Sequence, residues 1–174
     1  GDPLAFDVQY SPDNGTSWEM VAQNITQTSV ELPTINFVAG AQARVRVWVS
    51  DGIHTASDES DGPFTVPNHT PTVEITQPAG DVTIVISQTL GLEASAYDVD
   101  TGTMPDEQVQ WSSDRDGPLG NGAQLSVAVL SVGTHTITVR ADDGQGGVAT
   151  DTVLVTVLES PPPPTSVYLP LIMR

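Results

Sequence analysis

The chain has 174 residues, enough for one large domain or two small ones, and it contains no cysteine, which excludes a disulfide framework and a cysteine-based zinc site. It carries 22 acidic residues against five basic ones, all arginine, for a formal net charge of −17. Such a surface repels phosphate backbones and anionic lipid, so we exclude nucleic acid and membrane surfaces as partners. Divalent cations are the natural counter-charge.

Hydrophobic residues in the first part of the chain alternate with polar ones, as in strands that bury one face. The alternation runs through residues 4–10 and 44–49. Between them, Asn14-Gly15 suits the positive φ angles of a tight hairpin turn. Further strands are expected at residues 17–21, 28–32 and 64–66.

The segment VPNHTP, residues 66–71, interrupts the alternation with two prolines and predicts a domain boundary. A second set of strands is expected at residues 72–75, 90–96, 108–111, 124–129, 135–141 and 148–158. Their spacing, with turns rich in Gly and Asp, predicts an all-β fold of two immunoglobulin-like β-sandwiches in tandem. The expected domains are residues 1–67 and 68–159, followed by a proline linker and an extended apolar tail at 160–174.

Both halves resemble modules of secreted bacterial proteins. FDVQYSPDNGTSWEMVAQNI, TSVEL and ARVRVWVSDG resemble the middle and end of a fibronectin type III domain. This resemblance implies that residues 4–10 are the third strand of that fold and that the first two strands are lacking. GLEASAYDVDTG, VQWSSDRDGPLGNG and GTHTITVRADDGQGG resemble bacterial immunoglobulin-like and PKD-like modules. The resemblance implies an extracellular or cell-surface location, and it supports a fold more strongly than a function.

Without two strands, the first domain would have an uncovered apolar face. The missing strands belong to a longer precursor, or another segment covers the face by strand addition. The tail TSVYLPLIMR, too short to span a bilayer, follows a four-proline spacer and is a candidate donor strand. Head-to-tail donation would build a filament, although Pro170 removes one ladder donor. Alternatively, the tail is a sorting or anchoring signal. The donated face would consist of Val167, Leu169, Leu171 and Met173.

Acidic residues in two loops are candidate calcium ligands. In an immunoglobulin-like sandwich, the loops after residues 90–96 and 135–141 lie at the same end, and clustered carboxylate oxygens suit Ca²⁺. The spacing does not match an EF-hand, and the alternative is that these aspartates cap backbone amides in turns. The expected ligands are Asp98, Asp100, Asp142 and Asp143, with Asp106 and Glu107 as additional oxygen donors.

Three sequons, at Asn14, Asn24 and Asn68, are either N-glycan sites on exposed loops or chance matches. Two tryptophans have distinct expected roles. Trp111 is expected in the core of the second sandwich. Trp48 is out of phase with the valines beside it in the chain, so we expect it at the surface, as the better candidate for stacking on a sugar ring.

Catalysis has little support in the sequence. His54, His69 and His135 lie in different segments without a ligand or general-base spacing, and there is no GxSxG motif. We therefore expect a non-catalytic extracellular structural or adhesive module whose partners are other copies of itself or components of the cell envelope or extracellular matrix. The alternative is a spacer or carbohydrate-binding accessory region of a larger secreted hydrolase.

Overall fold

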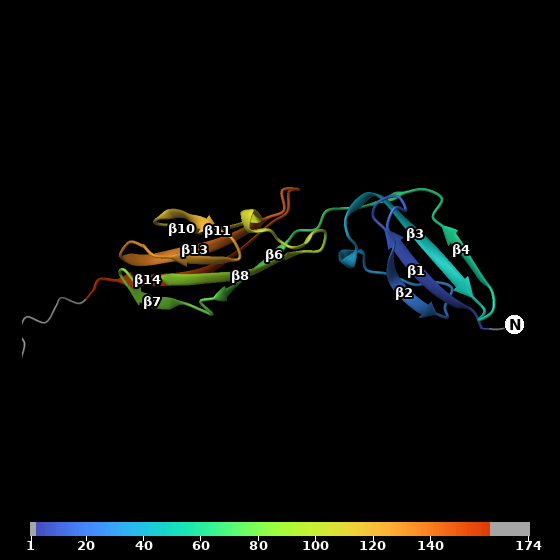
Figure 1. Cartoon of the computed structure of the whole chain (residues 1–174), viewed down its shortest axis with the longest axis horizontal. Coiled ribbons are helices and arrows are strands. Elements are labelled where there is room, and N and C mark those ends of the chain that lie inside the picture. The colour runs from blue at the N-terminus through green and yellow to red at the C-terminus, as the bar shows by residue number, and fades with distance from the viewer. Residues whose placement is uncertain (1–2, 161–174) are drawn as a thin grey trace, which may run out of the picture.

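The computed structural model describes residues 3–160, and these fold into strands with two short 3-10 helices and no α-helix, which confirms the predicted all-β class. None of the described helices is long and apolar enough to cross a bilayer. Two units lie end to end, the first on the right of Figure 1 and the second on the left. The first unit contains β1 (Ala5–Ser11), β2 (Glu19–Ile25), η1 (Thr34–Asn36), β3 (Gly40–Ser50), β4 (Thr55–Glu59) and β5 (Phe64–Val66).

The first unit is built on one antiparallel sheet with the strand order β2-β1-β3-β4, and β5 also pairs with β3. The turn between β1 and β2 has positive φ angles of 59° at Asn14 and 85° at Gly15, as the sequence predicts. Although β1 is the first strand in the chain, it lies inside the sheet, between β2 and β3. That position agrees with its assignment as the third strand of a fibronectin type III fold.

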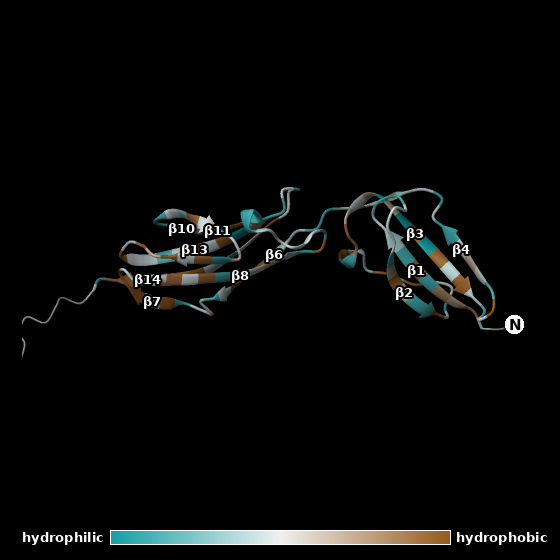
Figure 2. Cartoon of the chain, in the orientation of Figure 1, coloured by the Kyte–Doolittle hydropathy of each residue, from teal (hydrophilic) through white to brown (hydrophobic). Residues whose placement is uncertain are grey.

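The two faces of this sheet differ in character, because hydrophobic and hydrophilic residues alternate along β3 (Figure 2). One face carries a small core of Tyr10, Phe37, Ala43 and Val66. The rings of Tyr10 and Phe37 stack with their centroids 4.5 Å apart, and the Tyr10 hydroxyl donates to the carbonyl oxygen of Val38 at 2.6 Å. The opposite face carries Trp48, which is 38% exposed, so the predicted surface position of Trp48 is confirmed.

The strand predicted at residues 28–32 is wrong, because these residues form irregular structure. A strand needs a neighbour with which to share ladder hydrogen bonds. No strand of residues 3–160 pairs with this segment, and none of its backbone groups bonds to another described segment. It instead runs along the apolar face of the first sheet, where Thr28, Val30 and Leu32 line a hollow.

The second unit is a complete two-layer sandwich. Its elements are β6 (Thr72–Gln77), β7 (Val82–Val85), β8 (Leu90–Asp98), β9 (Gly102–Thr103), η2 (Asp106–Gln108), β10 (Val109–Ser113), β11 (Gly117–Asn121), β12 (Gln124–Val127), β13 (Gly133–Asp142) and β14 (Val148–Leu158). One sheet has the order β11-β10-β13-β14-β7, and the other has the order β12-β8-β6 with β9 beside β8. Trp111 is 1% exposed between them, and its Nε1 donates to the carbonyl oxygen of Gly122 at 2.9 Å, which confirms its predicted core position.

Candidate functional site

The two acidic loops of the second unit contact the linker that joins the units. One loop begins at the end of β8 with Asp98 and includes Asp100. The other begins at the end of β13 with Asp142 and includes Asp143. Asp100 and Asp143 accept hydrogen bonds from linker residues, whereas Asp98 and Asp142 bond within their own loops or strands. The acidic residues therefore divide into a junction pair and a pair that supports local turns.

Asp100 connects three segments through one carboxylate. Its Oδ1 accepts from the backbone N–H of Ala39 at 2.6 Å and faces Nδ1 of His69 at 2.9 Å, and its Oδ2 accepts from the backbone N–H of His69 at 2.8 Å. Burial acts to raise the pKa of Asp100, but the hydrogen bonds from His69 and Ala39 outweigh it, so the pKa lies below its usual value. The ionised carboxylate thus ties the first unit and the linker to the second unit.

Asp143 forms the second junction contact. Its Oδ2 accepts from Nδ2 of Asn68 at 2.8 Å, while its Oδ1 accepts from the backbone N–H groups of Gln145 at 2.6 Å and Gly147 at 2.9 Å. The hydrogen bond from Asn68 is the main cause that lowers the pKa of Asp143; burial opposes it, and the backbone donors reinforce it. Asp143 therefore closes its own turn and holds the linker at the same time.

Sequence reasoning missed Asn68 and His69 as partners of the acidic loops. Both lie between Pro67 and Pro71, in a segment that the composition marks only as a boundary. Polar residues fixed between two prolines are a usable signal, because the prolines restrict the backbone and hold the side chains in a narrow range of positions. No periodicity in the chain indicates the partner Ala39.

The calcium assignment stays a prediction. Oδ1 of Asp98 accepts from the backbone N–H of Asp100 at 2.6 Å, while Oδ2 is buried and has no partner in residues 3–160. Asp142 pairs with Arg140 at 2.7 Å, and Asp106 accepts from the backbone N–H of Ala123 at 3.1 Å. Within the described part of the chain, no three His, Asp or Glu side chains are grouped as a metal ion requires. The contacts present are those of turn and junction hydrogen bonding.

The three sequons occupy different environments. Asn14 and Asn24 are exposed and have positive φ angles of 59° and 52°, and Oδ1 of Asn14 accepts from Nε of Arg44 at 2.7 Å. Asn68 is also exposed, but its Nδ2 donates to Asp143 and to the carbonyl oxygen of His69. A glycan attached to this nitrogen would replace one of its two hydrogens, so glycosylation of Asn68 and the full junction contact exclude each other.

A serine, a histidine and an aspartate meet in the second unit. Nδ1 of His135 lies 2.9 Å from Oγ of Ser113 and 3.7 Å from a carboxylate oxygen of Asp116, and Nε2 lies 2.7 Å from the carbonyl oxygen of Ser131. His135 is 0% exposed and Ser113 is 4% exposed. A nucleophilic hydroxyl must reach its substrate, so the buried Ser113 supports a structural role for this group.

The apolar face of the first sheet opens into a hollow of about 450 Å³. Phe6 and Val8 come from β1, Val45 and Val47 from β3, and Phe64 from β5. The irregular segment at residues 27–32 forms one wall of this hollow, which we call the acceptor hollow. The proposed donor residues Val167, Leu169, Leu171 and Met173 lie outside the described residues.

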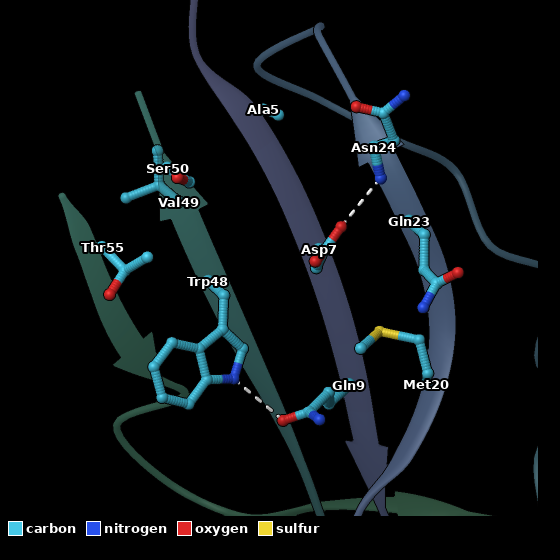
Figure 3. A pocket seen from close by; sticks show the side chains of 10 residues that line it. All are labelled: Ala5, Asp7, Gln9, Met20, Gln23, Asn24, Trp48, Val49, Ser50 and Thr55. Carbon is cyan, nitrogen blue, oxygen red and sulfur yellow. Dashed lines mark hydrogen bonds between the residues drawn. The ribbon is translucent and has the colours of Figure 1, made fainter. Parts of the chain in front are cut away.

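The opposite face of the same sheet carries a second hollow, of about 650 Å³ (Figure 3). Trp48 points into it from β3, and its Nε1 donates to Oε1 of Gln9 at 2.9 Å. Asp7 of β1 accepts from the backbone N–H of Asn24 at 2.8 Å, and Gln23 lies beside them on β2. We call this the tryptophan hollow.

Comparisons with known proteins show distant likenesses only. No family model and no curated protein matches the chain. Fibronectin(III)-like modules of Clostridium thermocellum CbhA are 14% identical with a TM-score of 0.41, over 50% of this chain and 96% of that one. Domains 4–9 of surface layer protein SbsC are 16% identical with a TM-score of 0.42, over 93% of this chain but only 23% of that one. Three N-terminal domains of the bacteriophage RB49 outer capsid protein Hoc are 17% identical with a TM-score of 0.41, over 90% and 51%. TM-scores below 0.5 at these identities assign no function.

Proposed function

We propose that this chain is a non-catalytic structural module of an extracellular or cell-surface protein, and that its copies join by strand donation. The observation that carries the proposal is the acceptor hollow on a sheet that has no second layer among the described residues. Exposed apolar surface of this kind marks an interaction site, because burying it releases free energy at roughly 25 cal/mol per Å².

The segment at residues 28–32 gives the acceptor hollow a way to bind a strand. Its backbone N–H and C=O groups are not engaged in a ladder with other described residues, and its side chains line the hollow. A strand laid beside it would supply those ladder bonds and at the same time cover Val47 and Phe64. The acceptor would then gain the strand that the sequence predicts there and that the isolated chain does not form.

The donor we propose is the apolar tail of a second copy. Strand β14 starts at the junction and ends at the far end of the second unit, and its 11 residues span roughly 37 Å. Fully extended, residues 159–174 reach at most about 55 Å. A tail that turned back along its own second unit would bring only its last few residues to the first unit, whereas a neighbouring copy can present the whole apolar run.

The tail has the alternation that the acceptor needs. Val167, Leu169, Leu171 and Met173 share one face of an extended strand and match the apolar lining of the hollow. Pro170 lacks an N–H group, so the strand can pair fully along one edge only, with Pro170 on the other edge. One paired edge is all that residues 28–32 require.

The junction supports a structural role independently of the donor. Asp100 and Asp143 tie the linker to the second unit with charged acceptors, and hydrogen bonds to charged groups are worth about 1.5–3 kcal/mol each. Two units held end to end in this way set a fixed separation between whatever lies on either side of them. This property is common to the subunit of an assembly and to a spacer.

The test compares residues 1–174 with a version that ends at Glu159, using light scattering after size exclusion and negative-stain microscopy. We expect the longer chain to form head-to-tail assemblies and the shorter one to be monomeric. A synthetic peptide of residues 165–174 should bind the shorter chain. Binding should be lost with Val47→Asp, which puts a charge into the hollow, and kept with Val129→Asp, a matched change at an exposed valine of the second unit.

Two results would contradict strand donation. If both versions are monomeric and the peptide does not bind, the acceptor hollow is covered by strands from elsewhere, and an export or anchoring role for the tail is favoured. If assemblies persist after Val47→Asp, the tail acts at a different surface. Neither result affects the structural role of the junction, which is measured separately.

A further inference from the structure

The tryptophan hollow differs from the acceptor hollow in the chemistry of its walls. Side chains with amide or carboxylate groups lie to one side of a single aromatic ring, with Met20 among them, as Figure 3 shows. Two of them, Gln9 and Asp7, lie on β1 and two, Gln23 and Asn24, lie on β2. Trp48 stands across from them on β3. The walls therefore offer apolar surface from Trp48, Met20 and Val49 together with several hydrogen-bonding groups, which is the composition of a small-molecule site.

Trp48 is held in place before any ligand arrives. Its Nε1 donates to Oε1 of Gln9 at 2.9 Å, so the indole is anchored across the sheet while 38% of the residue stays exposed. The same bond orients the Gln9 amide, whose Nε2 group remains a donor for a ligand. An aromatic ring that is fixed in advance loses little conformational entropy on binding.

Asp7 is held in the same manner. Its Oδ1 accepts from the backbone N–H of Asn24 at 2.8 Å, and its Oδ2 accepts no hydrogen bond from residues 3–160. The hollow therefore presents a fixed acceptor, Oδ2 of Asp7, and a fixed donor, Nε2 of Gln9. Neighbouring hydroxyl groups on one ring both donate and accept, and they match such a pair of groups.

The charges near the hollow favour a neutral ligand. Asp7 is the one charged residue in its lining. Arg46, two residues before Trp48 on β3, lies 3.9 Å above the ring centre of Trp18 and 6.0 Å from the ring centre of Trp48, and it pairs with Glu59 at 2.6 Å. No unpaired cation in the lining is available to bind phosphate, sulfate or carboxylate groups, and the net charge of −17 repels polyanions.

We propose that the tryptophan hollow is a binding site for a neutral carbohydrate, with Trp48 stacked on a pyranose ring and Asp7, Gln9 and Gln23 bonded to its hydroxyls. The C–H face of a pyranose is an apolar patch that fits an indole ring, while its rim of hydroxyls requires the donors and acceptors described above. From β3 to β2 the sheet measures roughly 9–10 Å, two strand spacings, which admits a short oligosaccharide.

A proline-rich peptide is the competing ligand, because such peptides also dock on aromatic side chains. Their grooves are lined by several aromatic side chains that pack against successive prolines. Trp48 is the only aromatic residue in the lining of this hollow, and half of the polar lining residues carry amides. The composition therefore favours a hydroxyl-rich ligand. The site does not depend on strand donation, since it lies on the opposite face of the sheet.

The test is a titration of the 174-residue chain with neutral hexasaccharides of glucose, mannose and N-acetylglucosamine, followed by calorimetry and tryptophan fluorescence. A polygalacturonate oligosaccharide and a polyproline peptide serve as competing probes. We expect at least one neutral sugar to bind saturably and to shift the emission. Trp48→Ala should weaken binding about tenfold or more. Tyr97→Ala, which removes an exposed aromatic ring from the second unit, should leave it unchanged.

Asp7→Asn keeps the acceptor for the Asn24 N–H and removes one ligand acceptor, so it should weaken sugar binding severalfold without lowering the melting temperature. This variant still tests the site if Trp48→Ala disturbs the sheet. The proposal is overturned if none of the neutral sugars binds, if binding survives Trp48→Ala, or if only the anionic sugar or the polyproline peptide binds at Trp48.

Discussion

The two units of the chain have similar strands but bury very different amounts of hydrophobic surface. In the second unit, 16 buried hydrophobic residues fill the space between two sheets. In the first unit, five buried hydrophobic residues lie on one face of a single sheet. Hydrophobic burial is the main favourable term in folding. A single sheet whose apolar face is covered only at one end buries little hydrophobic surface. The first unit is therefore the one that stands to gain stability from a partner.

This difference also explains where binding surfaces are found. The second unit has used its apolar side chains internally, and its loops serve turns and the junction. The first unit has both an apolar hollow and a hollow of mixed polar and apolar lining with a fixed tryptophan, on opposite faces of one sheet. A sheet that lacks its second layer thus has two surfaces to offer to ligands, where a complete sandwich has one surface per sheet.

The largest effect is expected in the core of the second unit. Trp111→Ala removes a fully buried ring and leaves the carbonyl oxygen of Gly122 without its donor, which should lower the free energy of unfolding by about 3–5 kcal/mol. Urea unfolding followed by circular dichroism measures it. Trp48→Ala, at the surface, should cost far less. An equal loss in both variants would contradict the contrast between the units.

The junction should show the next largest effect. Asp100→Ala leaves the backbone N–H groups of Ala39 and His69 unpaired, and the loss of hydrogen bonds to a charged group costs about 1.5–3 kcal/mol. We expect the linker to loosen, which small-angle scattering would record as a wider range of separations between the units. Asp114→Asn, in a loop away from the junction, is the control. An unchanged scattering profile in Asp100→Ala would mean that the units are held by other contacts.

Acid should weaken the same contact. The folded pKa of Asp100 lies below its unfolded value of about 3.9, so its contribution to stability is fully present above roughly pH 4 and is lost as the pH falls through the folded pKa. Asp100→Asn cannot titrate at this position. The difference in melting temperature between the native chain and Asp100→Asn should therefore shrink as the pH is lowered below 4. A constant difference would show that the charge of Asp100 has no part in the junction.

How much the sequence predicts depends on how the strands are stabilised. The strand predicted at residues 148–158 matches β14 at both ends, because its hydrophobic residues alternate with polar ones and pack into the core between two sheets. β4 is not predicted, because all five of its residues are exposed. Backbone pairing with β3 and the Arg46–Glu59 ion pair hold it, and neither leaves a hydrophobic pattern in the sequence. β11 is missed for a related reason, since its glycines and proline carry no alternation. Hydrophobic periodicity in the sequence reflects the burial of one face of a strand, so it does not reveal strands that bury few side chains.

The candidate sites show the same limit. The position of Trp48 on the outer face follows from its phase in β3, and the structure confirms it. The junction contacts do not follow from any local pattern, because they join residues 61 and 75 positions apart in the chain. Residues 28–32 fail as a predicted strand for a similar reason, since the local sequence is suitable but the neighbour that a strand requires is not among the described residues.

A smaller effect is expected in the core of the first unit. Tyr10→Phe keeps the ring that stacks on Phe37 and removes the hydroxyl that donates to Val38, which should cost about 1 kcal/mol. Fluorescence of Trp18 and Trp48, which both belong to this unit, follows its unfolding. If the tail peptide of residues 165–174 fills the acceptor hollow, adding it should offset the loss. A loss larger than that for Trp111→Ala would reverse the proposed ranking of the two units.

Calcium is expected to have the smallest effect. If the buried Oδ2 of Asp98, together with Asp100, Asp142 and Asp143, binds Ca²⁺ as weakly as extracellular modules do, with a Kd of about 10⁻⁴ M, then 1 mM Ca²⁺ adds about 1.4 kcal/mol of stability. A chelator should remove this increment, and Asp142→Asn should reduce it, whereas Asp114→Asn should not. Because Asp100 and Asp143 already accept N–H donors, any ion must share them with the linker, so calcium should also stiffen the junction. Identical melting curves in calcium and in chelator would leave hydrogen bonding as the full role of these aspartates.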